Sequence, residues 1–185
     1  MNLRKNFNIY FFSFFIYCII GWLYEVLLEL FVYNHGFVNR GFLYGPYLPV
    51  YGFGAIILIF LLKNISYKKR YIKKLNISPI ITFILIFFIT TVIEYFTGFM
   101  LDLILNIRLW DYTNKFLNIN GLVCFSASFR FALGGTIFLY LLQPNFNKLI
   151  NKIPIKTQNL IVFTLLTIIT TDLLVTILKY LLMLF

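Results

Sequence analysis

The sequence predicts an all-α membrane protein: a polytopic bundle of five transmembrane helices, forming a single transmembrane domain over residues 1–185. Its hydrophobic fraction is 61% and its charged fraction 12%, whereas the apolar share of a soluble domain is about 45–50%. Apolar runs long enough to cross a bilayer recur along the chain, separated by short polar or basic segments. Both observations indicate that the chain is surrounded by lipid.

The five spans follow from the apolar runs, since a spanning helix needs about 17–25 apolar residues. The second predicted span is shorter than this, and its start could lie back near Leu43. The first is interpreted as a retained helix because it lacks the cleavage site of a signal peptide. The predicted spans are residues 8–33, 48–62, 79–103, 122–142 and 160–182. The predicted breaks are Asn34–Pro49, Lys63–Lys74, Asn106–Gly121 and Pro144–Pro154.

The positive charges predict the orientation of the chain. Its net charge of +10 would suggest a nucleic-acid partner in a soluble protein. Here eleven Lys and Arg residues fall before the first span, between the second and third, or between the fourth and fifth, against three in the alternate loops. The positive-inside rule therefore places the N-terminus in the cytoplasm and the C-terminus outside, with no nucleic-acid partner. An alternative use of the basic segment Lys63–Lys74 is binding of anionic lipid.

Two carboxylates near the outer end of the first span point to a functional site. A charged side chain at the centre of a membrane helix costs about 2.5–3.5 kcal/mol and usually faces the bundle interior or a water-filled cavity. Glu25 and Glu29 are four residues apart and share one helix face. The loop that follows carries His35, Asn39 and Arg40. We expect the functional site of the protein to lie at this turn.

Four ionisable residues from four spans are predicted at a similar depth. Glu25, Glu94, Arg130 and Asp172 each lie about eight to eleven residues from the outer end of a span, which is about 12–16 Å at 1.5 Å per residue. We expect Arg130 to be a central cation, neutralised by one or two of the three acids. The surplus carboxylates would then carry a proton or bind a cationic group. The alternative is an ion pair that only fixes helix register.

The chain also contains a hint of internal duplication. Glu25 is followed by the turn N-R-G-F at residues 39–42, and Glu94 by the turn I-R-L-W at residues 107–110. The two helical hairpins would cross the membrane in the same direction. Parallel repeats of this kind occur in transporters, with the binding site at the repeat interface.

Five segments carry a family resemblance. They are GWLYEV at residues 21–26, FVNRGFLYGPYLPVYGFGA at 37–55, EYFTGFMLD at 94–102, LWDYT at 109–113 and FLNINGLVCF at 116–125. In this order and spacing they resemble the bacterial family named Putative ABC-transporter type IV, the CmpB-like membrane proteins. The resemblance covers most of the first 145 residues and leaves out the last span. It implies a small polytopic membrane protein that acts as an ABC transporter permease.

These observations together give a set of candidate ligand-binding residues. They are Glu25, Glu29, Asn39, Arg40, Glu94, Trp110, Asp111, Asn120 and Arg130. The sequence contains no metal-ligand spacing, and we expect neither a metal nor a cofactor.

The expected function is that of an ABC transporter permease, or a transporter-associated protein, in the cell membrane. Its charged cavity would open to the extracytoplasmic side. No P-loop is present in the sequence, so an ATP-driven step needs a separate ATPase subunit. Five spans are few for alternating access, which favours a homo-oligomer or hetero-oligomer. One alternative is a sensor or accessory protein that binds a ligand or peptide at the same cavity. Another is an intramembrane enzyme acting on lipid, which we disfavour because no convincing nucleophile is present.

Overall fold

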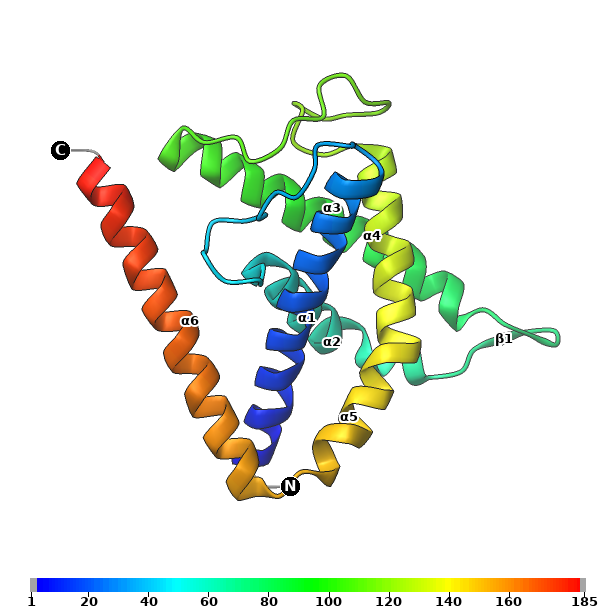
Figure 1. The fold of residues 1–185 in the computed structure, drawn as a ribbon. Coiled ribbons are helices and arrows are strands. Elements are labelled where there is room, and N and C mark those ends of the chain that lie inside the picture. The colour runs from blue at the N-terminus through cyan, green and yellow to red at the C-terminus, as the bar shows by residue number, and fades with distance from the viewer. Residues whose placement is uncertain (1–2, 184–185) are drawn as a thin grey trace. The chain divides into compact units, whose positions relative to one another are not determined.

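The computed structural model describes residues 3–183, and this part of the chain is mostly helical (Figure 1). The elements in order are α1 (Leu3–Phe31), α2 (Pro49–Tyr67), β1 (Tyr71–Ile72), β2 (Leu75–Asn76), α3 (Ser78–Leu105), α4 (Phe125–Ile137), the π-helical segment η1 (Phe138–Leu142), α5 (Gln143–Lys152) and α6 (Ile155–Met183). The described residues contain five helices long and apolar enough to cross a membrane, since α4, η1 and α5 run on as one. The predicted five-span helical fold is therefore confirmed. The orientation and the parallel repeat stay predictions.

The chain divides into two compact units. One comprises Met1–Ile56 and Asn145–Phe185, and the other comprises Ile57–Pro144. The boundaries fall inside α2 and near the start of α5. The loop between α1 and α2, residues 32–48, belongs to the first unit and is called the first loop below. The loop between α3 and α4, residues 106–124, belongs to the second unit and is called the second loop.

In the first unit, α1 packs against α6 through buried polar and apolar contacts. The Asn8 side chain is buried and donates hydrogen bonds to Gln158, at 3.4 Å, and Asn159, at 2.8 Å. Gln158 in turn donates to the carbonyls of Ile150 and Ile153, both at 2.9 Å. These bonds add a side-chain donor to carbonyls at the end of α5, where intrahelical partners run out. They fix the turn by which α5 leads into α6.

In the second unit, α4 packs on α3 through small side chains. A Cβ atom on Gly135 would lie 2.8 Å from Ile86, so the glycine lets the two helices approach closely. The Thr91 hydroxyl on α3 donates to the Ser128 hydroxyl on α4 at 2.7 Å. Ser128 and Ala132 are both buried. Close packing and a polar contact inside the apolar layer thus hold this pair together.

The predicted break at Pro144–Pro154 was wrong over most of its length, because the helix continues to Lys152. A proline inside a helix lacks an N–H donor, and its ring clashes with the carbonyl four residues earlier, here that of Tyr140. The π-helical segment η1 widens the backbone at residues 138–142, which relieves this clash. Only Ile153 and Pro154 separate α5 from α6.

Other helix ends also differ from the predictions. The fourth span begins at Phe125 instead of residue 122, because an isolated bridge from Ile119 to Val123 keeps that segment extended. The second span runs on past residue 62 to Tyr67, so Lys63 is helical. A lysine near a membrane surface can extend its ammonium group into water without ending the helix. The first span ends at Phe31, before Asn34 adopts a positive φ of 55°.

Candidate functional site

The first loop is fastened to α6 by the Asp172 carboxylate. Oδ1 accepts a hydrogen bond from the backbone N–H of Tyr44, at 3.0 Å, and Oδ2 accepts one from that of Gly45, at 2.8 Å. The Tyr47 hydroxyl also donates to Oδ2, at 2.5 Å, and the Thr176 hydroxyl donates to Oδ1, at 3.2 Å. A carboxylate with several donors can remain charged in an apolar setting. Asp172 therefore binds the backbone of the first loop to α6.

The Tyr47 side chain is buried, with 4% of its surface exposed, where it contacts Cys18 and Leu43. Burial raises the pKa of the Tyr47 phenol above its ordinary value, and the neighbouring Asp172 carboxylate raises the pKa further. The phenol thus stays protonated and remains a donor to Asp172 over a wide pH range.

The first loop is fastened to α1 by Glu29. This side chain is buried, with 5% of the residue exposed. The His35 Nδ1 atom lies 2.8 Å from one carboxylate oxygen, and the Arg40 guanidinium lies 3.3 Å from the other. The backbone N–H of His35 also donates to the Glu29 carbonyl, at 3.1 Å. Arg40 supplies the positive charge that a buried carboxylate needs.

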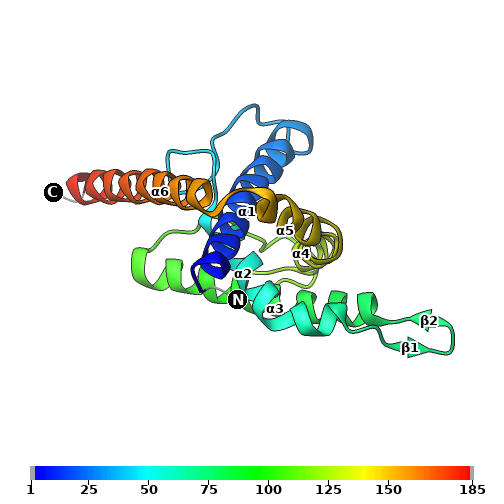
Figure 2. The same ribbon diagram turned by 90° about the horizontal axis from the view of Figure 1, so that it is seen from below.

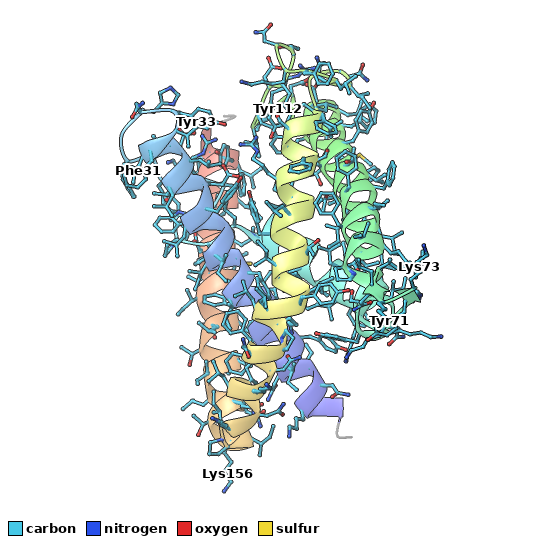
Figure 3. All side chains as sticks on the ribbon, turned by 90° about the vertical axis from the view of Figure 1, so that its right-hand side faces the viewer. Phe31, Tyr33, Tyr71, Lys73, Tyr112 and Lys156 are labelled. Atoms are coloured by element: carbon cyan, nitrogen blue, oxygen red, sulfur yellow. The ribbon has the colours of Figure 1, made fainter. Side chains whose placement is uncertain are left out.

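Asn39 connects α1 to the far side of the first loop. The Trp22 indole N–H donates to Asn39 Oδ1 at 2.7 Å, and the Asn39 amide donates to the Tyr44 carbonyl at 3.1 Å. Gly41 has a φ of +104°, a conformation that L-residues with side chains rarely adopt. The loop path is thereby set between Glu29 and Asp172. Figure 3 labels Phe31 and Tyr33, where α1 ends and the loop begins.

Glu25 is bound by the hydroxyl of Tyr51, which lies in the first turn of α2. The Tyr51 ring packs so closely on α1 that a Cβ atom on Gly21 would lie 2.2 Å from it. Gly21 and Glu25 are one turn apart on α1, so the first makes room for the ring and the second accepts from its hydroxyl.

The second loop is a compact structure built by its own polar side chains. The backbone N–H of Tyr112 donates to the Gly121 carbonyl at 2.8 Å. The Asn118 side chain donates to two loop carbonyls and accepts from the Gly121 N–H. Asp111 accepts from the Thr113 N–H at 2.9 Å. This bond lowers the pKa of the Asp111 carboxyl below its ordinary value.

Glu94 on α3 lies under the second loop, where the Tyr112 hydroxyl donates to its Oε1 atom at 3.1 Å. The Trp110 indole donates to the Leu122 carbonyl at 2.8 Å, and its ring packs against Gly98. The Asn120 amide donates to the Tyr95 hydroxyl at 3.0 Å. Three predicted site residues thus hold the loop onto α3. Figure 3 shows Tyr112 in this loop.

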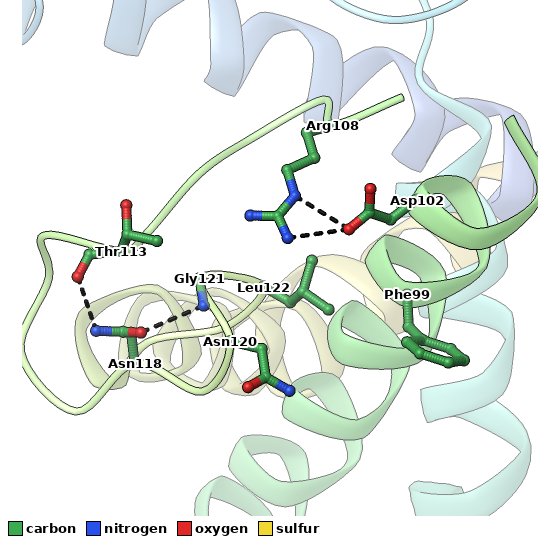
Figure 4. A pocket seen from close by; sticks show the side chains of 8 residues that line it. All are labelled: Phe99, Asp102, Arg108, Thr113, Asn118, Asn120, Gly121 and Leu122. Carbon is green, nitrogen blue, oxygen red and sulfur yellow. Dashed lines mark hydrogen bonds and ion pairs between the residues drawn. The ribbon is translucent and has the colours of Figure 1, made fainter. Parts of the chain in front are cut away.

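An open pocket of 540 Å³ lies between the end of α3 and the second loop (Figure 4). At its edge the Arg108 guanidinium donates to one oxygen of Asp102 through Nε, at 3.1 Å, and Nη2, at 3.0 Å. The two side chains are 44% and 39% exposed, so this ion pair is in contact with solvent. The residues lining the pocket are Phe99, Asp102, Arg108, Thr113, Asn118, Asn120, Gly121 and Leu122.

Arg130 is an exposed residue of α4, and its Nε atom donates to the Ser126 carbonyl at 3.1 Å. Glu94 and Arg130 belong to the second unit, and Glu25 and Asp172 belong to the first. The predicted layer of acids around Arg130 therefore stays a prediction. Within their own units, Glu25 and Glu94 each accept a hydrogen bond from a tyrosine hydroxyl.

A family model covers nearly the whole of this architecture. The family described as Putative ABC-transporter type IV matches residues 12–177, which include both loops and most of α6. The chain belongs to this family. The match reaches Asp172, beyond the segments that carried the resemblance in sequence. No curated protein and no solved structure matches the chain.

The family match and the five apolar helices support a transporter-associated membrane role for the chain. Sequence reasoning missed three features of its site: the partner of Glu25 in Tyr51, the ion pair of Asp102 with Arg108, and the binding of Asp172 to the first loop. Asp102 and Arg108 are six residues apart across a helix end, so their proximity could have been anticipated. The other two contacts join residues more than twenty positions apart and depend on the loop path.

Proposed function

We propose that the chain is a permease, the membrane-embedded subunit of a transporter whose energy comes from ATP hydrolysed by a separate chain. The observation that carries this proposal is the family match over residues 12–177 together with five helices able to cross a membrane. The sequence has no P-loop, so the nucleotide chemistry belongs to a partner. The membrane is the cell membrane, with the N-terminus in the cytoplasm, as the charge distribution favours.

The pocket beside the second loop is the best candidate for first contact with a solute. Its 540 Å³ lies within the range of about 300–1,000 Å³ that small-molecule sites occupy. Its lining offers a solvent-exposed ion pair and the amide of Asn120, whereas the Asn118 amide is bonded within the loop. A charged solute group can compete for either member of such a pair. The fitting ligand is a small polar solute that carries both hydrogen-bond donors and acceptors.

The polar residues of the first unit favour the pocket beside the second loop as the solute site, because they already have structural partners. Glu29, Arg40 and Asn39 hold the first loop in place. Their role in the proposed function is therefore to shape the outer face, with Glu25 positioned by Tyr51. Chemistry on the solute is not part of the proposal: the chain binds and passes a ligand without an enzymatic step, metal or cofactor of its own.

A ligand screen on the full chain tests the pocket. The chain in nanodiscs is heated with small polar solutes, and solutes that raise its unfolding temperature are kept. Arg108→Gln should remove the rise for such a solute, because it takes away the cation at the pocket edge. Lys115→Gln, which changes a loop charge outside the lining, should leave the rise unchanged. A rise that survives Arg108→Gln would contradict the pocket assignment.

A second candidate function is a sensor or accessory protein that binds the same ligand without moving it. Carboxylates hold each loop against helices of its own unit. Loops held in this way favour a protein that binds a ligand without a large conformational change. Uptake of the identified solute into proteoliposomes that contain the chain and its ATPase separates the two. ATP-dependent uptake supports the permease, and binding without uptake supports the sensor.

A further inference from the structure

The hairpin formed by β1 and β2 joins two membrane-spanning helices and carries a concentrated positive charge. Residues 63–77 contain six Lys or Arg residues and no acid. The strand register pairs Tyr71 with Asn76 and Ile72 with Leu75. Because α2 ends at Tyr67 and α3 begins at Ser78, the hairpin lies at the surface of the bilayer that these helices cross. Figure 2 shows it projecting from the start of α3.

The hairpin is fixed to its helices by Ser78, a fully buried residue. The Ser78 hydroxyl donates to the Lys68 carbonyl at 2.7 Å and accepts from the Arg70 N–H at 2.8 Å. The Ile77 N–H donates to the Arg70 carbonyl at 2.8 Å. The Arg70 guanidinium donates to the Ile65 carbonyl at 3.2 Å. These bonds anchor the base of the hairpin, so its tip is held in a defined direction.

The tip exposes apolar side chains that water would not stabilise. Tyr71, Ile72 and Leu75 have 58%, 61% and 66% of their surface exposed. A two-stranded hairpin is at best marginally stable in water without an apolar face to bury. Lys69, Lys73 and Lys74 are exposed beside these residues, and Figure 3 labels Tyr71 and Lys73 at the tip. Apolar and aromatic side chains interleaved with lysines are typical of segments that lie in the headgroup region of a membrane.

We propose that the β1–β2 hairpin is an anchor that binds the headgroups of anionic phospholipids in the leaflet beside it. The argument is charge complementarity: the segment has only cations, and the bilayer surface next to it supplies phosphates. Tyr71, Ile72 and Leu75 enter the boundary between headgroups and acyl chains, and the lysines pair with the phosphates. The anchor fixes the ends of α2 and α3 relative to the membrane surface.

Protection of the hairpin tip by lipid tests this proposal. The full chain carrying Ile72→Cys is placed in nanodiscs of phosphatidylcholine, with or without phosphatidylglycerol, and labelled with an uncharged polyethylene glycol maleimide. Cys18 and Cys124 are 0% and 2% exposed, so the chain without the substitution gives the background. Each of the three lysines near an anionic surface should contribute a factor of about five to binding, so labelling should be at least about tenfold slower with phosphatidylglycerol.

Two sets of charge changes complete the experiment. Adding Lys69→Gln, Lys73→Gln and Lys74→Gln should abolish the tenfold difference between the two bilayers. The matched control neutralises three exposed lysines in α5 and the first turn of α6, Lys148, Lys152 and Lys156, and should keep it. Equal labelling rates in the two bilayers would overturn the proposal and favour an acidic protein surface as the partner. A difference that persists without the hairpin lysines would overturn it as well.

Discussion

Replacing Asp172 by Asn should release the first loop from α6 without removing the helix from the membrane. The carboxylate accepts hydrogen bonds from two backbone N–H groups and two hydroxyls, two on each oxygen. An Asn side chain keeps one acceptor oxygen and points an NH₂ group at two donors. At about 1.5–3 kcal/mol for a hydrogen bond to a charged group, the change costs about 3 kcal/mol of loop stability.

Hydrogen exchange of the backbone amides measures this loss directly, because Tyr44 and Gly45 donate their N–H groups to Asp172. A loss of about 3 kcal/mol in local opening free energy corresponds to exchange about 100-fold faster at these two amides. The full chain in detergent or nanodiscs, followed by mass spectrometry of loop peptides, gives the rates.

The matched control is Thr176→Val, which removes the longest of the four hydrogen bonds, at 3.2 Å, and keeps the carboxylate. It should speed exchange by no more than about fivefold, the equivalent of one ordinary hydrogen bond of about 1 kcal/mol. If Asp172→Asn left the exchange of Tyr44 and Gly45 within threefold of the unmodified chain, the role of Asp172 in binding the first loop to α6 would be refuted.

Two further predictions concern packing and pH in the first unit. Gly52→Ala should destabilise the chain by about 1–3 kcal/mol, because a Cβ there would lie 2.5 Å from the Cys18 Sγ atom, whereas Gly54→Ala, with nothing within 4 Å, should cost nothing. Thermal unfolding in detergent compares them, and equal unfolding temperatures would contradict the α1–α2 packing. Tyr47→Phe should lower the unfolding temperature by an amount that depends on pH. Because the pKa of Tyr47 is raised in the fold, its contribution is complete below the ordinary value of 10.0 and is lost as pH rises through the raised pKa. A difference between Tyr47→Phe and the unmodified chain that stays constant well above pH 10.0 would argue against the bond to Asp172.

The spans were predictable from the sequence because lipid imposes a simple requirement. Backbone polar groups must be satisfied within each spanning segment, so apolar runs of sufficient length become helices. Helix ends were less predictable where two signals competed. Pro144 was interpreted as a break, but the π-helical turn before it lets the helix continue. The start of α6 was placed too late because Lys156 and Gln158 made its first turn look polar, although Gln158 is buried and bonded to α5.

The sequence could predict that the acids need partners, but it could not predict which partners they have. A carboxylate in an apolar helix is costly, so the sequence alone indicates that Glu29 and Asp172 need polar partners. What each carboxylate meets depends on the path of the first loop, which Gly41 and the Asn39 side chain set. Helical periodicity has no information on that path. Arg40 and Asn39 were named as ligand-binding residues, and the structure gives them partners inside the chain.

The most direct test of the account is to isolate the chain from its own cells under mild conditions and determine what remains bound to it. The predicted result is a particle heavier than the 21.9 kDa of one chain, containing an ATPase subunit and hydrolysing ATP. Native mass spectrometry of the same sample identifies the subunits and their ratio. A preparation that is uniformly a 21.9 kDa monomer and hydrolyses no ATP would contradict the proposed permease function.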